Sequence, residues 1–204
     1  MEKIPVPTTS EKSEIYLLFS ELFARELTVE NIENLANLIN EGVLKLAKMP
    51  LMRPMIDAIS LMAENPKETE RELAAVYAFL FLGVGGRNSV PPYESAYGSS
   101  EGRLCQEPFS AMQRELEQLD MHIVQDFPEP PDHISIELEV ASILAARQDQ
   151  PKHFEAFLEA RLKGWIGEFA TRCARSDRHG FYAALAGAVA GFVELDLNQF
   201  SEAA

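Results

Sequence analysis

The sequence contains few cysteines, and their placement bears on several kinds of site. Only two of the 204 residues are cysteine, Cys105 and Cys173, and they form neither a C-x-x-C pair nor a metal-ligand spacing. Two isolated cysteines are typical of buried thiols in a reducing compartment. We therefore expect no disulfide framework and no cysteine-ligated metal.

Basic residues are scarce relative to acidic ones. The chain has 18 Lys and Arg against 32 Asp and Glu, which gives a net charge of −14. Such a chain repels nucleic acids and anionic lipids, so neither is expected as a partner. It should attract cationic partners, although an acidic surface can equally serve solubility alone.

Long apolar runs are missing as well. The longest uncharged apolar stretch, FYAALAGAVAGFV at 181–193, has 13 residues, fewer than the ~20 that a membrane-spanning helix needs. The first residues, MEKIPVPTTSEKSEIYLLF, show no secretion signal. These features predict a cytoplasmic protein without membrane insertion.

Common catalytic and nucleotide-binding motifs do not occur. GVGGRN at 83–88 fits neither G-x-G-x-x-G nor a P-loop, and it follows helical sequence rather than a strand. We interpret it as a helix end followed by turns. G-x-S-x-G and H-E-x-x-H are also lacking.

Helical periodicity is the dominant pattern that is present. NPKE at 65–68 predicts a helix start, with Asn65 as N-cap and Pro66 at the first helical position. HISIELEV alternates like a strand, but it follows two prolines and continues into ASILAAR, so we predict a helix capped by Asp132. One apolar helix face comprises Ile15, Leu18, Phe19, Leu22 and Phe23, and further helices are predicted near 29–48, 52–63, 65–81, 106–120, 132–148, 152–175 and 179–195.

The fold prediction is therefore all-α: a compact helical bundle of about eight to ten helices. We expect one domain over residues 1–204. Two long connections, at 83–105 and 121–131, are unusual for such a fold and are typical of functional or hinge segments. The second is a candidate hinge between an N-terminal and a C-terminal lobe.

The first connection contains VPPYES. Pro91 and Pro92 favour an extended, stiff backbone, which can present Tyr93, Glu94 and Tyr97 to a ligand at little entropic cost. The alternative is that both tyrosines are amphipathic core residues.

The second connection ends in EPPDHISIELE. Asp132, His133 and Glu137 could support acid–base catalysis or bind a metal, but no nucleophile can be assigned and two or three ligands give a weak signal. The alternative is a helix cap followed by a packed histidine. Between 115 and 146 there are eight acidic and no basic residues, so an arginine-bearing partner fits this segment.

The last third contains HFEAFLEARLKGWIGEFA. Phe154, Leu158, Trp165 and Phe169 form one apolar stripe, with Arg161 on its line. A core helix is the simpler interpretation, and a peptide-binding groove is the alternative.

The order and spacing of YAFLFLGVGG, VPPYESAYGSSEGRL, EPPDHISIELEV and FLEARLKGWIGEFA resemble the TorD/DmsD/NarJ family of redox-enzyme maturation chaperones. The likeness extends over residues 12–197. Many relatives carry tryptophan in place of Tyr93 and histidine in place of Arg161.

The resemblance implies a cytoplasmic chaperone without catalytic turnover. Such proteins bind the twin-arginine signal peptide, and in some cases the body, of a molybdenum or tungsten bis-pterin oxidoreductase until its cofactor is inserted, and so prevent premature export. The family includes monomers and domain-swapped dimers. Tat translocase components are candidate partners. Weak guanine-nucleotide binding is also implied, although no other cofactor and no metal are expected.

We therefore predict that the two connections converge on a peptide site. In this hypothesis the tyrosines offer aromatic faces, the carboxylates pair with arginines, and His133 orients the carboxylates. A metal-assisted hydrolase using Asp132, His133 and Glu137 and a nonspecific acidic helical adaptor remain the alternatives. The predicted peptide-binding residues are Pro92, Tyr93, Glu94, Ser95, Tyr97, Asp132, His133 and Glu137.

Overall fold

The computed structural model describes residues 7–40, 49–98, 107–147 and 149–203. Within these ranges the chain forms nine α-helices and no strand, which confirms the all-α prediction. The helices are α1 (Thr9–Ala24), α2 (Val29–Asn40), α3 (Arg53–Met62), α4 (Pro66–Phe81), α5 (Glu107–Gln118), α6 (Ile134–Ala146), α7 (Pro151–Phe157), α8 (Ile166–Ser176) and α9 (Phe181–Ala203). Short 3₁₀ turns occur at η2 (Pro50–Met52), η3 (Gly86–Asn88) and η4 (Glu94–Ala96), and a π-helical segment at η5 (Leu158–Leu162).

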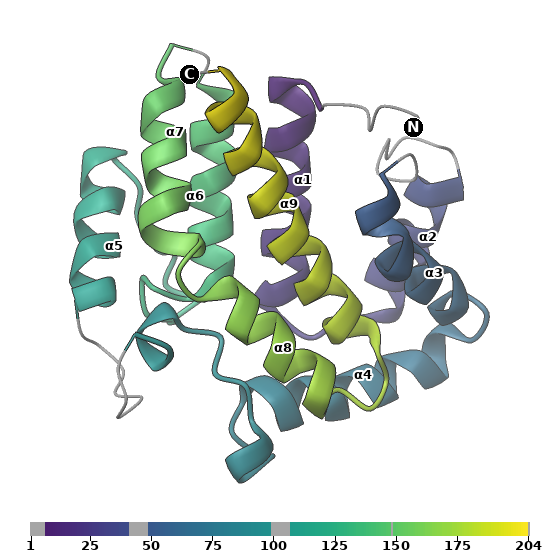
Figure 1. The fold of residues 1–204 in the computed structure, drawn as a ribbon. Helices are drawn as coiled ribbons and strands as arrows, with labels where there is room; N and C mark the ends of the chain where they lie inside the picture. The colour runs from purple at the N-terminus through teal and green to yellow at the C-terminus, as the bar shows by residue number, and fades with distance from the viewer. Residues whose placement is uncertain (1–6, 41–48, 99–106, 148, 204) are drawn as a thin grey trace.

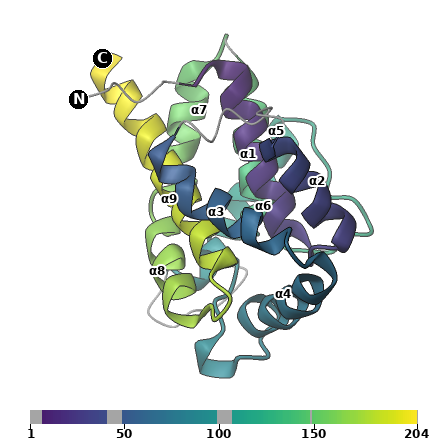
Figure 2. The ribbon, with the colours of Figure 1, turned by 90° about the vertical axis from the view of Figure 1, so that its right-hand side faces the viewer.

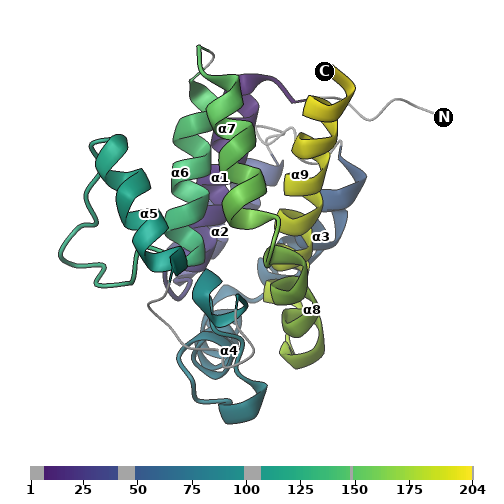
Figure 3. The ribbon, with the colours of Figure 1, turned by 60° about the vertical axis from the view of Figure 1, so that its left-hand side comes forward.

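The helices pack around α1 and α9 (Figure 1). α1 makes its most extensive contact with α6, α6 packs on α7, and α8 packs on α9. α2 and α3 cover the face made by α1 and α9 (Figure 2), whereas α5 stands on the far side, beyond α6 (Figure 3). α4 lies across one end of the bundle (Figure 1).

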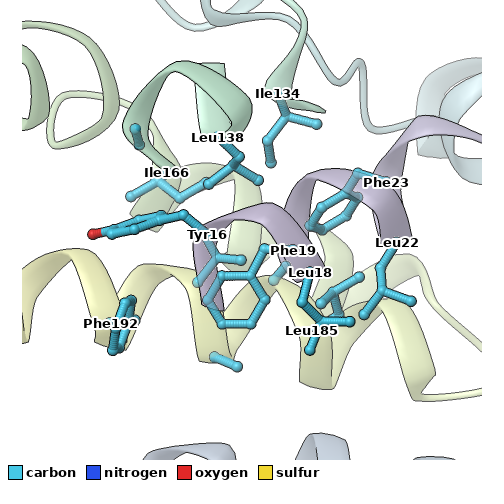
Figure 4. Packing of buried hydrophobic residues seen from close by; sticks show 14 of the residues in the cluster. Tyr16, Leu18, Phe19, Leu22, Phe23, Ile134, Leu138, Ile166, Leu185 and Phe192 are labelled. Carbon is cyan, nitrogen blue, oxygen red and sulfur yellow. The ribbon is translucent and has the colours of Figure 1, made fainter. Parts of the chain in front are cut away.

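The centre of the core is aromatic. Figure 4 shows Tyr16, Phe19 and Phe23 of α1 directed towards the same interior as Leu185 and Phe192 of α9. The ring centroids of Tyr16 and Phe192 are 5.1 Å apart, and those of Phe19 and Phe192 are 6.0 Å apart. The predicted apolar face of α1 is buried throughout, because side chains three and four positions apart share one side of a helix.

α9 is long and apolar enough, by length and composition, to cross a membrane over Phe181–Ser201. Its apolar side chains are accounted for by the core, since Phe181, Tyr182, Leu185 and Phe192 are fully buried. The same composition therefore serves as the central helix of a packed bundle.

Two sequence predictions about the helices need correction. α6 is capped by His133 rather than Asp132, because the imidazole Nδ1 of His133 accepts a hydrogen bond from the backbone N–H of Ser135. Asn65 is the N-cap residue of α4 and Pro66 begins the helix, as predicted, although the Asn65 side chain makes no capping bond to the backbone. The single helix predicted at 152–175 is divided into α7, η5 and α8, since the N–H of Lys163 bonds to the carbonyl of Leu158 five residues earlier.

Some predictions lie partly outside the described residues. The end of the helix predicted at 29–48, the end of the connection at 83–105, and Cys105 belong to this group. The connection at 121–131 is described: the Arg25 guanidinium donates to the Asp126 carbonyl at 3.1 Å. The single domain and the hinge at 121–131 stay predictions.

A buried charge joins the two ends of the chain. Asp196 of α9 is fully buried, and its carboxylate lies 2.5 Å from Lys12 Nζ and accepts a hydrogen bond from the Tyr16 hydroxyl at 3.0 Å. Burial raises the pKa of Asp196, and the neighbouring Lys12 ammonium opposes that rise. α1 and α9 are therefore linked by an ion pair whose partners depend on each other.

We expect Lys12→Met to destabilise the fold by about 3–5 kcal/mol at neutral pH, because it leaves the Asp196 carboxylate buried and uncompensated. The substitution raises the folded-state pKa of Asp196 further. Stability contributed by the protonated acid is complete below the unfolded pKa and lost as pH rises through the folded pKa, so the defect should shrink in mild acid. Urea unfolding at two pH values measures this. Lys67→Met, at an exposed lysine of α4, is the control, and an equal loss at both pH values would contradict the interpretation.

Candidate functional site

The two proline-containing connections meet, as predicted. Tyr93 and His133 form an isolated antiparallel bridge. The N–H of Ile134 donates to the Pro92 carbonyl at 2.8 Å, and the N–H of Glu94 donates to the Asp132 carbonyl at 3.0 Å. Segments about forty residues apart are thus joined by backbone hydrogen bonds, which leaves their side chains in one place.

Asp132 holds this junction together from the inside. Its side chain is fully buried, and its Oδ2 accepts a hydrogen bond from the Ser95 N–H at 3.1 Å. Ser95 is buried as well, and its hydroxyl and Asp132 Oδ1 have no hydrogen-bond partner among the described residues. In this conformation Asp132 stabilises the turn at η4, and a ligand arginine cannot reach it directly.

His133 is a neutral, packed side chain. Its Nδ1 lies 2.7 Å from the Ser135 hydroxyl, and its ring contacts the rings of Tyr93 and Phe127 at centroid distances of 5.4 and 5.6 Å. Burial lowers the pKa of His133 to about 4. The expectation that His133 orients the carboxylates is therefore replaced by a different arrangement, in which it caps α6 and joins an aromatic row.

The two tyrosines differ in how their rings are used. The Tyr93 hydroxyl donates to Glu129 at 2.8 Å, and the ring is half-buried. The Tyr97 hydroxyl donates to the Pro91 carbonyl at 2.9 Å, while the Arg172 guanidinium lies 4.8 Å from the Tyr97 ring centroid. Tyr97 already has a cation on its ring, so Tyr93 is the better-placed aromatic residue for a ligand.

Glu94 and Glu137 form a coupled pair of acids. Each carboxyl affects the ionisation of the other, and burial is the main cause that raises the pKa of both: that of Glu94 to about 7, and that of Glu137 well above its usual range. Two adjacent carboxylates cannot both ionise cheaply in a buried site, so Glu137 keeps its proton and Glu94 is the acid that ionises, at about pH 7.

Two donors from the late helices reach this pair. The Trp165 indole Nε1 donates to Glu137 Oε2 at 3.2 Å, and Arg161 lies 3.4 Å from Glu94 Oε2. Glu137 is fully buried, whereas the Glu94 side chain is 12% exposed. Of the three predicted carboxylates, Glu94 is the one placed to meet a ligand.

An acidic rim surrounds this junction. Glu107 lies 3.7 Å from Arg161 with a side-chain exposure of 70%, and Glu129 is half-buried beside Tyr93, whereas the nearby Asp126 is paired with Arg25. Sequence reasoning missed Glu107 and Glu129 as site residues: the excess of acids between 115 and 146 pointed towards Glu129 only in general terms, and no sequence signal pointed towards Glu107. We call Glu94, Glu107 and Glu129 the acidic rim.

The residues proposed for a metal-assisted hydrolase do not share a ligand-binding geometry. Asp132 bonds to the Ser95 N–H, His133 bonds to Ser135, and Glu137 bonds to Trp165. Across the described part of the chain, no group of three or more His, Cys, Asp or Glu side chains could hold a metal ion.

The apolar stripe of the late helices belongs to the core. Phe154, Leu158, Trp165 and Phe169 are all buried, which fits the simpler of the two interpretations. A groove exists nearby but is lined by other residues. It has a volume of about 410 Å³ and lies between η5, α8 and α9, with a floor formed by Ile166, Gly167, Ala190, Gly191, Val193 and Leu197 and a polar edge formed by Glu159, Lys163 and Glu194.

We expect Glu94 to make stability depend on pH near neutrality. Its folded pKa lies above its unfolded value of 4.5, so the stability contributed by its protonated form is complete below about pH 4.5 and is lost as pH rises through about 7. Glu94→Gln should abolish this loss. The single tryptophan, Trp165, reports on the adjacent Glu137 and allows fluorescence-monitored urea unfolding across this range. Glu117→Gln, at an exposed residue of α5, should behave like the wild type, and an unchanged profile in Glu94→Gln would contradict the assignment.

Comparisons with known proteins agree with this architecture. The family described as "Nitrate reductase delta subunit" matches residues 35–171. The chaperone protein TorD of Shewanella loihica is 33% identical over 198 residues, covering 93% of this chain and 93% of the relative. The chaperone protein TorD of Vibrio parahaemolyticus is 29% identical over 205 residues, covering 91% and 93%.

A solved structure supports the same fold. A candidate redox enzyme maturation protein from Archaeoglobus fulgidus superposes with a TM-score of 0.55 at 20% identity, covering 95% of this chain and 99% of the other. The sequence likenesses extend over nearly the whole chain and include both connections that form the site. The protein therefore belongs to the TorD/DmsD/NarJ family of redox-enzyme maturation chaperones, a family of chaperones and not of enzymes.

Proposed function

We propose that this chaperone acts in the cytoplasm on the precursor of a molybdenum or tungsten bis-pterin oxidoreductase. It would bind the twin-arginine signal peptide, hold the apo-enzyme while its cofactor is inserted, and so delay export. The observation that carries the proposal is the acidic rim around Glu94, built where the two connections meet. Family membership supports the chaperone activity, and the rim supports the peptide as its ligand.

The chemistry of the rim suits arginine better than lysine. A guanidinium can donate two parallel hydrogen bonds to one carboxylate and can stack on an aromatic ring, whereas an ammonium is a compact point charge. Tyr93 is close to two acids of the rim. Glu94 follows it in the sequence, and Glu129 accepts a hydrogen bond from its hydroxyl. One arginine can pair with a carboxylate while a second lies on the half-buried ring.

The apolar part of a signal peptide has a separate place to bind. The groove between η5, α8 and α9 is lined by Glu159, which lies with Arg161 on the π-helical segment, and by Lys163, which directly follows that segment. The rim and the groove are therefore connected through η5. A peptide with two arginines followed by an apolar segment matches this order of an acidic and then an apolar surface.

The alternatives are less well supported. A hydrolase built on Asp132, His133 and Glu137 conflicts with membership of a chaperone family and with the divergent hydrogen bonds of the three side chains. A nonspecific acidic adaptor would bind lysine and arginine peptides equally. The client, any contact with the Tat translocase, the oligomeric state and guanine-nucleotide binding stay predictions.

We expect a twin-arginine peptide to bind more tightly than the same peptide with both arginines changed to lysine, by at least about tenfold at low salt. Glu94→Gln should weaken binding of the arginine peptide by about 1–3 kcal/mol, because a charge-assisted hydrogen bond is lost. Isothermal titration calorimetry measures both effects. Glu117→Gln is the matched control on exposed α5, and equal affinity for the two peptides would favour the nonspecific adaptor.

We expect Gly167→Leu to weaken peptide binding by about 1–2 kcal/mol, because the new side chain fills the groove. A Cβ at Gly167 meets no atom within 4 Å, so the fold should tolerate the change. Gly187→Leu is the matched control, since Gly187 lies on α9 with equally open space and does not line the groove. Equal binding by both variants would place the apolar segment elsewhere.

A further inference from the structure

The acidic rim already holds an arginine of the chain itself. Arg161 Nη1 lies 3.4 Å from Glu94 Oε2 and 3.7 Å from Glu107 Oε2. The same nitrogen makes both contacts, so the guanidinium does not form the paired, parallel hydrogen bonds that give arginine–carboxylate pairs their strength. Arg161 thus offsets the charge of Glu94 but leaves room for a second guanidinium to form stronger hydrogen bonds with its carboxylate.

Arg161 is also reachable and has an alternative partner. Its side chain is 17% exposed, so it lies at the surface of the junction rather than beneath it. Glu107 is 70% exposed and could retain the guanidinium if Glu94 were taken by another cation. Glu107 also lies 3.7 Å from Arg114, so this outer position is shared and loosely defined.

The backbone that carries Arg161 is unusual. Arg161 belongs to the π-helical segment η5, and Trp165 follows four residues later. The two side chains reach Glu94 and Glu137 respectively, so one turn delivers a donor to each member of the acid pair. π-Helical turns are rare and occur frequently at functional sites.

We propose that Arg161 is an internal substitute for a client arginine: it occupies Glu94 in the unliganded protein, and the guanidinium of a bound peptide displaces it. This inference rests on the proposed function, because it names the residue that competes with the peptide at the same carboxylate. It also gives a basis for selectivity, since a displacing group must bind Glu94 better than one single-pronged arginine does.

Exchange of one guanidinium for another keeps the charge balance of the buried pair. Arg161 lowers the pKa of Glu94 against the effect of burial, and Glu137 beside it stays protonated. The pKa of Glu94 is about 7 with Arg161 in place, so at about pH 8 Glu94 is ionised before and after the exchange, and binding to the wild type requires little proton transfer. Without Arg161 the pKa of Glu94 would rise further, so Glu94 would still hold a proton at about pH 8 and release it when a guanidinium arrives.

The test uses Arg161→Gln in the full chain, with two probes: a twin-arginine signal peptide and the dipeptide acetyl-Arg-Arg-amide. Titration calorimetry at about pH 8 should show binding about five- to tenfold tighter for Arg161→Gln than for the wild type, because the competitor is gone. Near pH 6.5 the gain should shrink. Parallel titrations at about pH 8, in buffers of different ionisation enthalpy, should show that Arg161→Gln releases protons on binding and that the wild type releases few.

Three further variants sharpen the comparison. Adding Glu94→Gln to Arg161→Gln should remove the gain, since the carboxylate at issue is lost. Arg161→Lys keeps a positive charge near Glu94, so its affinity for the probes should lie between those of the wild type and Arg161→Gln. It replaces Arg161→Gln in the test if thermal melting shows that Arg161→Gln is unstable. Arg53→Gln is the matched control, because Arg53 forms an exposed pair with Asp57 on α3 at 3.1 Å.

The two proposals fail in different ways. If folded Arg161→Gln and Arg161→Lys bind both probes no more tightly than the wild type, the displacement proposal is overturned, while binding of the signal peptide by the wild type still supports the proposed function. If the signal peptide binds no variant but the dipeptide binds Arg161→Gln in a Glu94-dependent manner, displacement stands and the proposed function fails.

Discussion

The backbone pairing of Pro92–Glu94 with Asp132–Ile134 is the contact on which the site depends. The first of these segments leaves α4 through a glycine-rich turn and the second leads into α6, so the chain has no local reason to bring them together. Two hydrogen bonds and a buried carboxylate that caps the Ser95 N–H hold them. Because the prolines restrict the backbone, these few bonds are enough to fix the direction of the side chains. Tyr93, Glu94 and Glu129 then share one surface.

Burial separates the chemical roles of the acids that gather there. Asp132 serves as a structural acceptor, burial keeps Glu137 protonated, and Glu94 at the edge is the acid that ionises, at about pH 7. Two adjacent ionised glutamates would be costly to bury, so a protonated Glu137 beside an ionisable Glu94 at the edge is the stable solution. The late helices complete it, since Trp165 and Arg161 bring donors to the two glutamates. An acidic chain thereby obtains one defined position for a guanidinium rather than a diffuse negative surface.

Features that depend on neighbouring residues were predicted from the sequence, and features that depend on distant segments were not. The apolar face of α1 could be predicted because a period of 3.6 residues depends only on neighbouring positions. The helix at HISIELEV was predicted correctly, but its cap was assigned to Asp132, since sequence alone could not show that this carboxylate is used by Ser95 across the junction. The helix expected at 152–175 has no proline in its interior, so nothing in the sequence marks the π-helical segment. Glu107 and Glu129 were missed as site residues because their importance comes from segments distant in sequence.

By itself the sequence determined the helical fold, the family, the excess of negative charge and the two connections that form the site. These properties follow from composition, periodicity and the order of motifs, which do not require a folded chain. Only the tertiary structure decided which acid is charged, which residue caps α6, and that Arg161 lies on Glu94. The physical reason is that a pKa, a hydrogen bond and an ion pair depend on burial and on partners brought together by folding, and neither is encoded in any short stretch of residues.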